Sequence, residues 1–258
     1  MKLVKIDPPG TFCHYEAVLE LIDRLGGNTF LEVGCGAGDL SVKLLERGFS
    51  GVGVDFSEDA IEIATRRLKK FIDNDQYHLV KGNILDLSSL ECRFDFGLSM
   101  MVMEHIEDDL GFLKKIKSFI KPNGHVIVAV PGRRDKWSFE DETVGHLRRY
   151  DREDLLQTLG DAGLDSPDVW SVAVPTANLL FGISNLLVKR SSESQKLTQS
   201  KEEQTKSSGI REIPFKTVFP PAFRLILNRY SLFPLLITQR LFYRTGLGLT
   251  MLGFGKVQ

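Results

Sequence analysis

Short apolar runs alternate with helical patterns from residue 27 to residue 174, and this alternation limits the possible folds of the chain more than any other feature. Helical patterns begin at Ser57 and at residues 108 and 151. Strands that alternate with helices form parallel sheets, because parallel neighbours need crossover connections. We therefore predict an α/β fold with a doubly wound, mostly parallel sheet, and ligands beyond the carboxyl ends of its strands. The predicted strands, rich in Val, Ile, Leu or Phe, are residues 29–33, 51–55, 77–81, 94–99, 125–130 and 168–174.

A glycine-rich turn follows the first predicted strand, with Gly34, Gly36 and Gly38 at alternate positions. Glycines allow a ligand to approach the backbone closely, although a purely structural turn remains an alternative. A dinucleotide fingerprint would place a further Gly at position 39, where this chain has Asp39. At the end of the next strand, Asp55 can accept hydrogen bonds from the two ribose hydroxyls of an adenosine, or can cap the following helix. The two features indicate a nucleoside-containing ligand.

Together with later motifs, these residues resemble the class I S-adenosylmethionine-dependent methyltransferases. The matching segments lie within residues 27–173 and occur in family order at 32–38, 55, 82–84, 94–106 and 113–131. The resemblance implies the Rossmann-like methyltransferase fold with a seven-stranded sheet, S-adenosyl-L-methionine as cofactor and S-adenosyl-L-homocysteine as product. It also implies that Glu32 orients the methionine end and that the turn from Gly34 to Gly38, including Cys35, borders the methionine and ribose.

For the adenosine end, the resemblance implies that Asp55 binds the ribose hydroxyls and that Phe56 lies beside the adenine. Asn83 stands where the family often has Asp, and its amide oxygen can accept the same hydrogen bond from the adenine amino group. Ile84 would pack on the adenine ring. Two methionines, at 100 and 101, replace the commoner small, polar or acidic residues after the fourth strand, and Met100 is taken as a cofactor residue.

The segment Gly145-His146-Leu147-Arg148-Arg149-Tyr150 is similar to a Gly-His-x-Arg-Arg-Tyr segment of one methyltransferase subgroup. It follows the fifth strand, where the acceptor pocket is expected. His146 is the candidate general base, because imidazole titrates near neutrality, and Arg149 and Tyr150 are further catalytic candidates. An alternative is that His146 and Arg149 only fix the loop through hydrogen bonds. We expect His105 to frame the cofactor or support the structure, and no metal site.

The part of the chain from residue 170 onward carries twelve Lys and Arg against four Asp and Glu. Residues 191–212 are polar and are predicted to form a disordered loop. Residues 217–244 are rich in Phe, Leu and Arg, and Pro220, Pro221 and Pro234 are expected to break them into short helices. Residues 245–256 resemble the subgroup's last strand, expected antiparallel beside residues 168–174. The predicted organisation is a cofactor domain at 1–174, a hydrophobic and basic helical insertion or cap at 175–244, and a final strand within 245–258.

The predicted function is methyl transfer to a small-molecule or amphiphilic acceptor, with a lipid or lipid-linked compound as one option. The insertion is either ordinary helical core or a contact for an anionic membrane surface. A pI near 6.5 and dispersed basic residues disfavour nucleic acid. The alternatives are a nicotinamide-dependent oxidoreductase and a non-catalytic cofactor-binding or membrane-adaptor protein.

The chain has neither a signal-like apolar start nor an uncharged apolar run of about 18 residues. This predicts a cytoplasmic protein, with peripheral attachment to the inner membrane face as the alternative. The sequence leaves the oligomeric state open.

Overall fold

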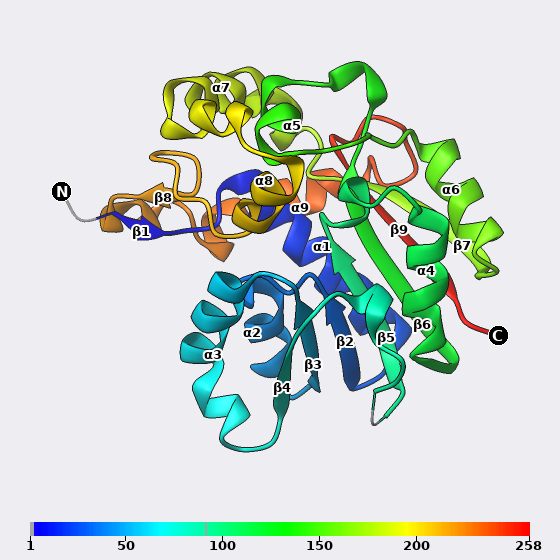
Figure 1. The fold of residues 1–258 in the computed structure, drawn as a ribbon. Coiled ribbons are helices and arrows are strands. Elements are labelled where there is room, and N and C mark those ends of the chain that lie inside the picture. Colours follow the sequence, from blue (N-terminus) through cyan, green and yellow to red (C-terminus); the bar gives the residue numbers. More distant parts are fainter. Residues whose placement is uncertain (1–2, 91) are drawn as a thin grey trace. The chain divides into compact units, whose positions relative to one another are not determined.

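A seven-stranded sheet forms the core of the computed structural model, which describes residues 3–90 and 92–258 (Figure 1). The strand order is β4-β3-β2-β5-β6-β9-β7, and every pairing from β4 to β6 is parallel. The predicted doubly wound, mostly parallel α/β fold is confirmed. The strands are β2 (Thr29–Val33), β3 (Ser50–Asp55), β4 (Tyr77–Lys81), β5 (Phe94–Met100), β6 (Ile120–Pro131), β7 (Asp165–Val172) and β9 (Thr250–Lys256).

The last strand, β9, lies between β6 and β7 and runs antiparallel to β6. The Asn123 amide donates to the carbonyl of Val257 at one end of this pairing, and the Gly132 amide donates to Leu249 at the other. Residue numbers therefore rise along one strand while they fall along the other. The predicted return of the final strand to a place beside residues 168–174 agrees with the observed strand order.

Four helices, α2 (Asp39–Leu45), α3 (Glu58–Ile72), α4 (Asp109–Ser118) and α6 (Arg152–Asp161), follow or precede these strands. The Ser57 hydroxyl caps α3 by accepting from the Ala60 amide, and the Asp108 carboxylate caps α4. Glycines bring helices and strands close together. A Cβ at Gly97 of β5 would lie 2.5 Å from Ile116 of α4.

Residues 121–124, a Lys-Pro-Asn-Gly run typical of turns, lie inside β6. The pairing of β5 with β6 shifts here, from Phe94 opposite Ile120 to Phe96 opposite His125. Asn123 adopts φ 67°, so the extra residues bulge from the ladder and the strand continues. Short 3-10 turns follow three strands: η1 (Ile84–Asp86), η2 (Met103–His105) and η3 (Arg134–Lys136).

The chain divides into two compact units. The sheet unit comprises Leu21–Val130, Glu153–Val169 and Leu252–Gln258, and the helical unit comprises Met1–Glu20, Pro131–Arg152 and Trp170–Met251. This division differs from the predicted boundary at residue 174, because two segments of the predicted cofactor domain, Met1–Glu20 and Pro131–Arg152, group with the insertion. The strand β1 (Val4–Lys5) pairs with β8 (Val218–Phe219), and α5 (Phe139–Val144) contacts α7 (Thr176–Arg190).

The prediction of a disordered loop at 191–212 is wrong for most of this range. The 3-10 helix η4 (Ser192–Thr198) and the helix α8 (Lys201–Ser208) occupy it. Ser200 and Glu203 form a reciprocal capping box at the start of α8, and the buried Gln204 amide donates to the Lys196 carbonyl at 2.7 Å. These local bonds order a tract whose composition alone would not bury enough surface.

Pro234 does not break its helix as predicted. After η5 (Pro221–Leu225), the helix α9 (Arg229–Arg240) continues through Pro234. Proline has no amide hydrogen, so the carbonyl of Tyr230 loses the helical hydrogen bond that residue 234 would otherwise donate. Tyr230 lies on the exposed side of α9, where water can donate to this carbonyl instead. Among the helices of the described residues, none is long and apolar enough to cross a membrane.

Candidate functional site

Glu32 lies near the carboxyl end of the central strand β2 and is buried. Its carboxylate accepts a hydrogen bond from the Ser41 hydroxyl of α2, and Ser41 lies 2.6 Å from the Tyr77 hydroxyl. Burial raises the pKa of Glu32 to about 8, although the Ser41 hydrogen bond acts in the opposite direction. A buried carboxyl with a raised pKa is suited to a ligand that brings a positive charge, because the cation stabilises the ionised carboxylate.

The three glycines of the turn after β2 have different tasks. All three adopt left-handed backbone, with φ 74° at Gly34, 53° at Gly36 and 74° at Gly38. A Cβ at Gly34 would lie 2.3 Å from Val102, and one at Gly38 would lie 2.6 Å from Leu68, so packing requires glycine at both positions. A Cβ at Gly36 would meet nothing within 4 Å. Gly36 is therefore the point at which a ligand can approach the backbone.

The Cys35 thiol, in contrast, is buried, and burial raises its pKa. This side chain is consequently part of the core. A contact between Cys35 and the cofactor, as predicted from the sequence, would therefore involve its backbone.

Asp55, at the end of β3, ties the turn to the start of α3. One carboxylate oxygen accepts from the Gly36 amide and the other from the Ser57 amide, both at 2.8 Å. The two sequence-based interpretations of Asp55 are thus compatible, because each oxygen has a second lone pair for an outside donor such as a hydroxyl. Burial raises the pKa of Asp55, while the backbone hydrogen bonds oppose that shift.

The residues predicted to surround an adenine follow β3 and β4 in the same unit. Phe56 exposes 38% of its surface, whereas Ile84 is buried at the start of η1. The Asn83 side-chain oxygen accepts from the Leu85 amide at 3.1 Å, which caps η1 and leaves the second lone pair available. Met100 is half-buried at the end of β5, and Met101 adopts φ 58°. All the predicted cofactor residues therefore belong to the sheet unit.

The sequence analysis missed Ser41 and Tyr77, which complete the surroundings of Glu32. A Cβ at Gly53 of β3 would lie 2.0 Å from the Tyr77 hydroxyl, so this glycine makes room for the tyrosine. The strand pattern at residues 77–81 includes Tyr77 but does not reveal its partners. The link from Tyr77 through Ser41 to Glu32 joins three elements, and it becomes visible only in the fold.

In the helical unit, Asp141 of α5 is the centre of a buried polar network. It is fully buried and accepts from Arg149 Nε at 2.8 Å and from Arg149 Nη2 at 2.9 Å. His146 Nδ1 lies 2.8 Å from the same carboxylate, and the Ser138 amide and hydroxyl also donate to it. Burial by itself would raise the pKa of Asp141, but the hydrogen bonds from His146 and Arg149 outweigh it and lower this pKa well below its usual range.

The network gives the three predicted catalytic residues different surroundings. Arg149 is buried and also donates to the Gly132 carbonyl at 2.9 Å, so its guanidinium holds the loop together. Tyr150 is buried, and its backbone bonds to Pro131 and Arg133 beside the end of β6. His146 is held by Asp141 through one ring nitrogen. These contacts favour a positioning task for Arg149, while catalytic tasks for His146 and Tyr150 remain predictions.

A hollow of about 420 Å³ lies next to His146 within the helical unit. Gly145 ends α5 with φ 78°, and a Cβ there would lie 3.0 Å from both Gln204 Oε1 and the Lys201 carbonyl of α8. The glycine of the Gly-His-x-Arg-Arg-Tyr segment thus allows α8 to pack beside the histidine. The hollow is lined by Trp137, Glu142, Gly145, His146, Leu197, Gln199, Lys201 and Gln204.

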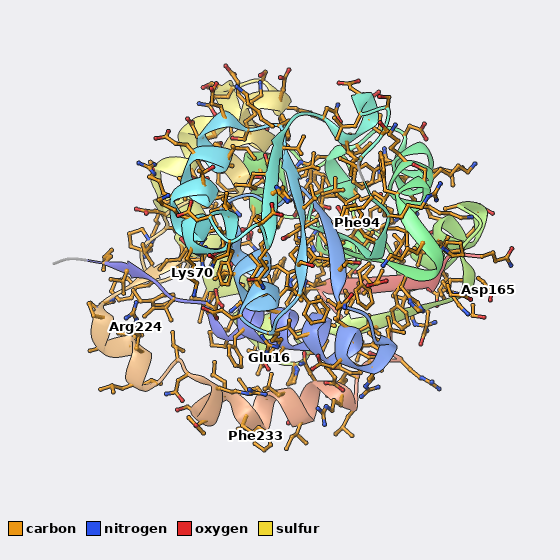
Figure 2. The ribbon with its side chains drawn as sticks, turned by 90° about the horizontal axis from the view of Figure 1, so that it is seen from below. Glu16, Lys70, Phe94, Asp165, Arg224 and Phe233 are labelled. Atoms are coloured by element: carbon orange, nitrogen blue, oxygen red, sulfur yellow. The ribbon has the colours of Figure 1, made fainter. Side chains whose placement is uncertain are left out.

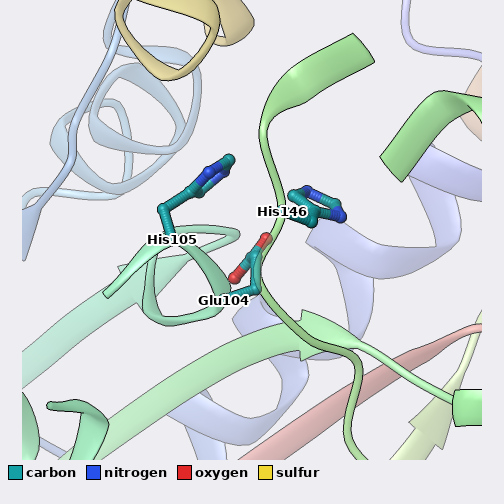
Figure 3. Close-up of side chains that lie close together, drawn as sticks. All are labelled: Glu104, His105 and His146. Atoms are coloured by element: carbon teal, nitrogen blue, oxygen red, sulfur yellow. The ribbon is translucent and has the colours of Figure 1, made fainter. Parts of the chain in front are cut away.

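Glu104 and His105 lie on η2, after β5. Figure 3 shows their side chains. Glu104 is buried and His105 is half-buried. Both belong to the sheet unit, as do the predicted cofactor residues. The predicted framing task of His105 stays a prediction.

Residues 12–166 match the family described as Methyltransferase domain. A ubiquinone biosynthesis O-methyltransferase of Bradyrhizobium diazoefficiens is 34% identical over 131 residues, which cover 51% of this chain and 50% of the relative. A demethylmenaquinone methyltransferase of Oceanobacillus iheyensis is 34% identical over 104 residues, 39% of this chain and 43% of the relative. The chain spans about half the length of the curated relatives it matches.

Solved structures with the same fold cover nearly the whole chain. A methyltransferase from Thermotoga maritima, described as a possible histamine N-methyltransferase, has a TM-score of 0.55 and 19% identity, covering 96% of this chain and 88% of its own. The cyclase SpnF has a TM-score of 0.59 and 16% identity, covering 95% and 81%. At these identities, the similarity shows the fold alone.

Proposed function

Because this chain belongs to the methyltransferase domain family, we propose that it transfers a methyl group from S-adenosylmethionine to a small, amphiphilic acceptor. The observation that carries this proposal is the arrangement of Glu32 and Asp55 around the open backbone at Gly36. The methionine end, the ribose and the adenine of the cofactor each have candidate binding residues in the sheet unit.

The buried Glu32 carboxyl would hold the amino group of the methionine end, since a cation compensates for a carboxylate removed from water. The two oxygens of Asp55 would accept from the ribose hydroxyls through their remaining lone pairs. Phe56, Asn83 and Ile84 would lie around the adenine. The residues present therefore fit S-adenosylmethionine.

The cofactor supplies a sulfonium methyl that is already activated, so the protein mainly has to align the acceptor and exclude water. His146 would remove a hydroxyl proton from the acceptor where that proton is held tightly. In the tautomer whose Nδ1–H donates a hydrogen bond to Asp141, His146 Nε2 is the basic atom and is oriented by a fixed, buried partner. The hollow beside His146, with Trp137 and Leu197 among its lining residues, would hold the acceptor.

The acceptor class is suggested by the relatives, because the names of both curated enzymes refer to quinones. We infer an acceptor with an aromatic ring and a hydroxyl group, joined to an apolar part. A lipid-linked intermediate is one such compound. The predicted contact of residues 175–244 with an anionic membrane would suit this class.

Calorimetric titration with S-adenosylhomocysteine tests the cofactor site. We expect the unmodified chain to bind and Asp55→Ala to bind at least about tenfold more weakly, because hydrogen bonds to a charged group contribute about 1.5–3 kcal/mol each. Asp59→Ala is the matched control, since Asp59 is an exposed carboxylate four residues further along. Equal affinity of the Asp55 and Asp59 variants would contradict the proposed site.

Two alternative functions give different results. A nicotinamide-dependent oxidoreductase would be stabilised against heat by a nicotinamide dinucleotide and not by S-adenosylhomocysteine. A non-catalytic cofactor-binding protein would bind S-adenosylhomocysteine but transfer no labelled methyl group to quinols or lipid extracts. The family match and Asp39, which forms an ion pair with Arg67 where the dinucleotide fingerprint has glycine, favour methyl transfer over hydride transfer.

A further inference from the structure

The end of the chain is entirely free of acidic residues. From residue 213 to residue 258 there is no Asp or Glu, while six Lys and Arg are present. A run of this length with one sign of charge creates a local positive field, although the whole chain has a formal net charge of only −1. The helix α9 lies in the middle of this run.

Buried contacts within the helical unit fix the direction in which α9 faces. Leu236 packs in a cluster with Cys13 and Ala173. The Gln239 side chain, which is buried, donates to the Cys13 carbonyl at 3.1 Å and accepts from the Ala173 amide at 3.0 Å. Because these bonds satisfy a buried amide, rotation of α9 about its axis would be costly. The opposite side of the helix is therefore held outward.

The outward side of α9 is apolar, whereas the solvent-exposed side of a helix is usually polar. The α9 outer face consists of Tyr230, Phe233, Ile237 and Leu241, whose spacings of three and four residues place them along one side of a helix. These side chains are 91%, 54%, 48% and 80% exposed. Figure 2 shows Phe233 on the outer side of the helix. Just before α9, Leu225 and Ile226 are 80% and 64% exposed.

Arginines flank this face in the sequence, at positions 224, 229, 240 and 244. Arg229 and Arg240 lie 3.7 Å and 3.0 Å from Glu16 and Glu20 of α1 (Pro9–Leu25), which partly neutralise them. Arg224 and Arg244 are exposed, and within the described residues neither has an ion-pair partner. Two uncompensated positive charges thus accompany a stripe of aromatic and aliphatic side chains.

We propose that the α9 outer face, with Arg224 and Arg244 beside it, docks onto an anionic lipid membrane surface. The apolar side chains would enter the boundary between headgroups and acyl chains, and the arginines would bind lipid phosphates. A second copy of the chain fits less well. Two such faces would bring arginines together, and the acid-free run offers no carboxylate to pair with them.

Vesicle flotation of the full chain tests this proposal without cofactor or acceptor, so its outcome is independent of the proposed methyl transfer. We expect binding to vesicles of phosphatidylcholine with phosphatidylglycerol and much weaker binding to phosphatidylcholine alone. Arg224→Gln with Arg244→Gln should weaken binding to the anionic vesicles about fivefold per arginine. Phe233→Ser with Ile237→Ser should weaken it about tenfold or more, through lost apolar burial.

The matched control is Leu179→Ser with Ile183→Ser on α7, which removes two apolar side chains of similar exposure, 76% and 59%, from another helix of the same unit. Both helices lie within residues 175–244, but the proposal confines the membrane contact to α9, so this α7 pair should bind like the unmodified chain. All the substituted residues are exposed, and circular dichroism verifies that the variants fold. Failure of the intact chain to float with anionic vesicles, or equal losses from the α9 and α7 pairs, would overturn the proposal. A concentration-dependent dimer that Phe233→Ser with Ile237→Ser abolishes, without vesicle binding, would assign the face to a second copy.

Discussion

At the residue scale, the charge of Glu32 links the buried core to ligand binding. Its pKa is raised to about 8, chiefly by burial, so the carboxyl is largely protonated at neutral pH. Binding an ammonium group would require the ionised form. The affinity for S-adenosylhomocysteine should therefore rise with pH up to about 8, by up to about tenfold per pH unit, and then level off. Calorimetry between pH 6 and 8.5 measures this slope.

Glu32→Gln separates this linkage from other titrations, because a neutral amide of nearly the same shape cannot change charge. The variant should bind weakly with little slope over this range. The ligand-free chain gives an independent readout. A carboxyl whose folded pKa exceeds its ordinary 4.5 binds more protons when folded, so stability should fall as pH rises from 4.5 towards 8, and Glu32→Gln should reduce that fall. Identical slopes for both proteins would refute this assignment.

Asp141→Asn should destabilise the helical unit, because it removes the negative charge that faces the buried Arg149. Breaking a buried ion pair from one side costs about 3–5 kcal/mol. Urea denaturation measures the loss, and Glu142→Gln, which changes the neighbouring exposed carboxylate of α5, is the control and should shift stability by less than about 0.5 kcal/mol. Equal midpoints for the two variants would show that the network contributes nothing to stability.

Sequence patterns locate residues at strand ends well, but they do not reveal partners across the fold. Asp55 was predictable because it stands at the end of an apolar strand, where α/β sheets bind ligands, whereas Glu32 was predicted through the resemblance to the methyltransferases. Ser41 and Asp141 were not predicted, since Ser41 belongs to a helix without a motif and Asp141 precedes the Gly-His-x-Arg-Arg-Tyr segment. A signal for Asp141 existed in the chain, because Ser138 precedes it by three residues as in a capping box.

At the element scale, the junction between α5 and α8 depends on Gly145. Its φ of 78° is strained for any other residue, and a Cβ would lie 3.0 Å from two atoms of α8. Gly145→Ala should destabilise by about 1–2 kcal/mol and speed cleavage by trypsin at Lys201 and Lys206. Gly160→Ala is the control, because Gly160 is helical and its Cβ would meet nothing within 4 Å. It should leave the cleavage rate unchanged. Equal rates in both variants would mean that α8 does not depend on this contact.

The elements of the chain were predictable to different degrees. The strands at 29–33 and 77–81 have the predicted bounds, because turn-forming residues such as Gly, Asn and Asp flank both ends of each strand. The prediction of disorder in the polar tract after α7 was wrong, because it relied on composition. It overlooked a short helix-start signal, in which Ser200 precedes Glu203 by three residues as in a capping box. The predicted helix break at Pro234 was wrong because the local signal of a proline was overrated. On the exposed side of α9, this proline leaves one carbonyl without its helical hydrogen bond, and water can reach that carbonyl.

At the scale of the whole molecule, the division into units was the hardest feature to predict. Composition changes near residue 174, and that change set the predicted boundary. The helical unit instead gathers Met1–Glu20 and Pro131–Arg152 with the later segment, through pairings such as β1 with β8 and Glu140 with Arg211 and Lys216. These pairings join positions about 70 to 210 residues apart, and no local pattern encodes them.

The proposed cofactor and the proposed membrane contact use residues of different units, and hydrogen exchange can test them in one protein. S-adenosylhomocysteine should slow exchange of the amides in the turn after β2, at Ser57 and in η1, because a bound ligand stabilises the state that holds these bonds, by about 2.7 kcal/mol at a hundredfold excess over Kd. Anionic vesicles should instead slow exchange from Arg224 to Arg244. Phe233→Ser with Ile237→Ser should remove only the second effect, and Asp55→Ala only the first. If either variant removed both effects, the two sites would share one folding equilibrium and could not be assigned to separate ligands.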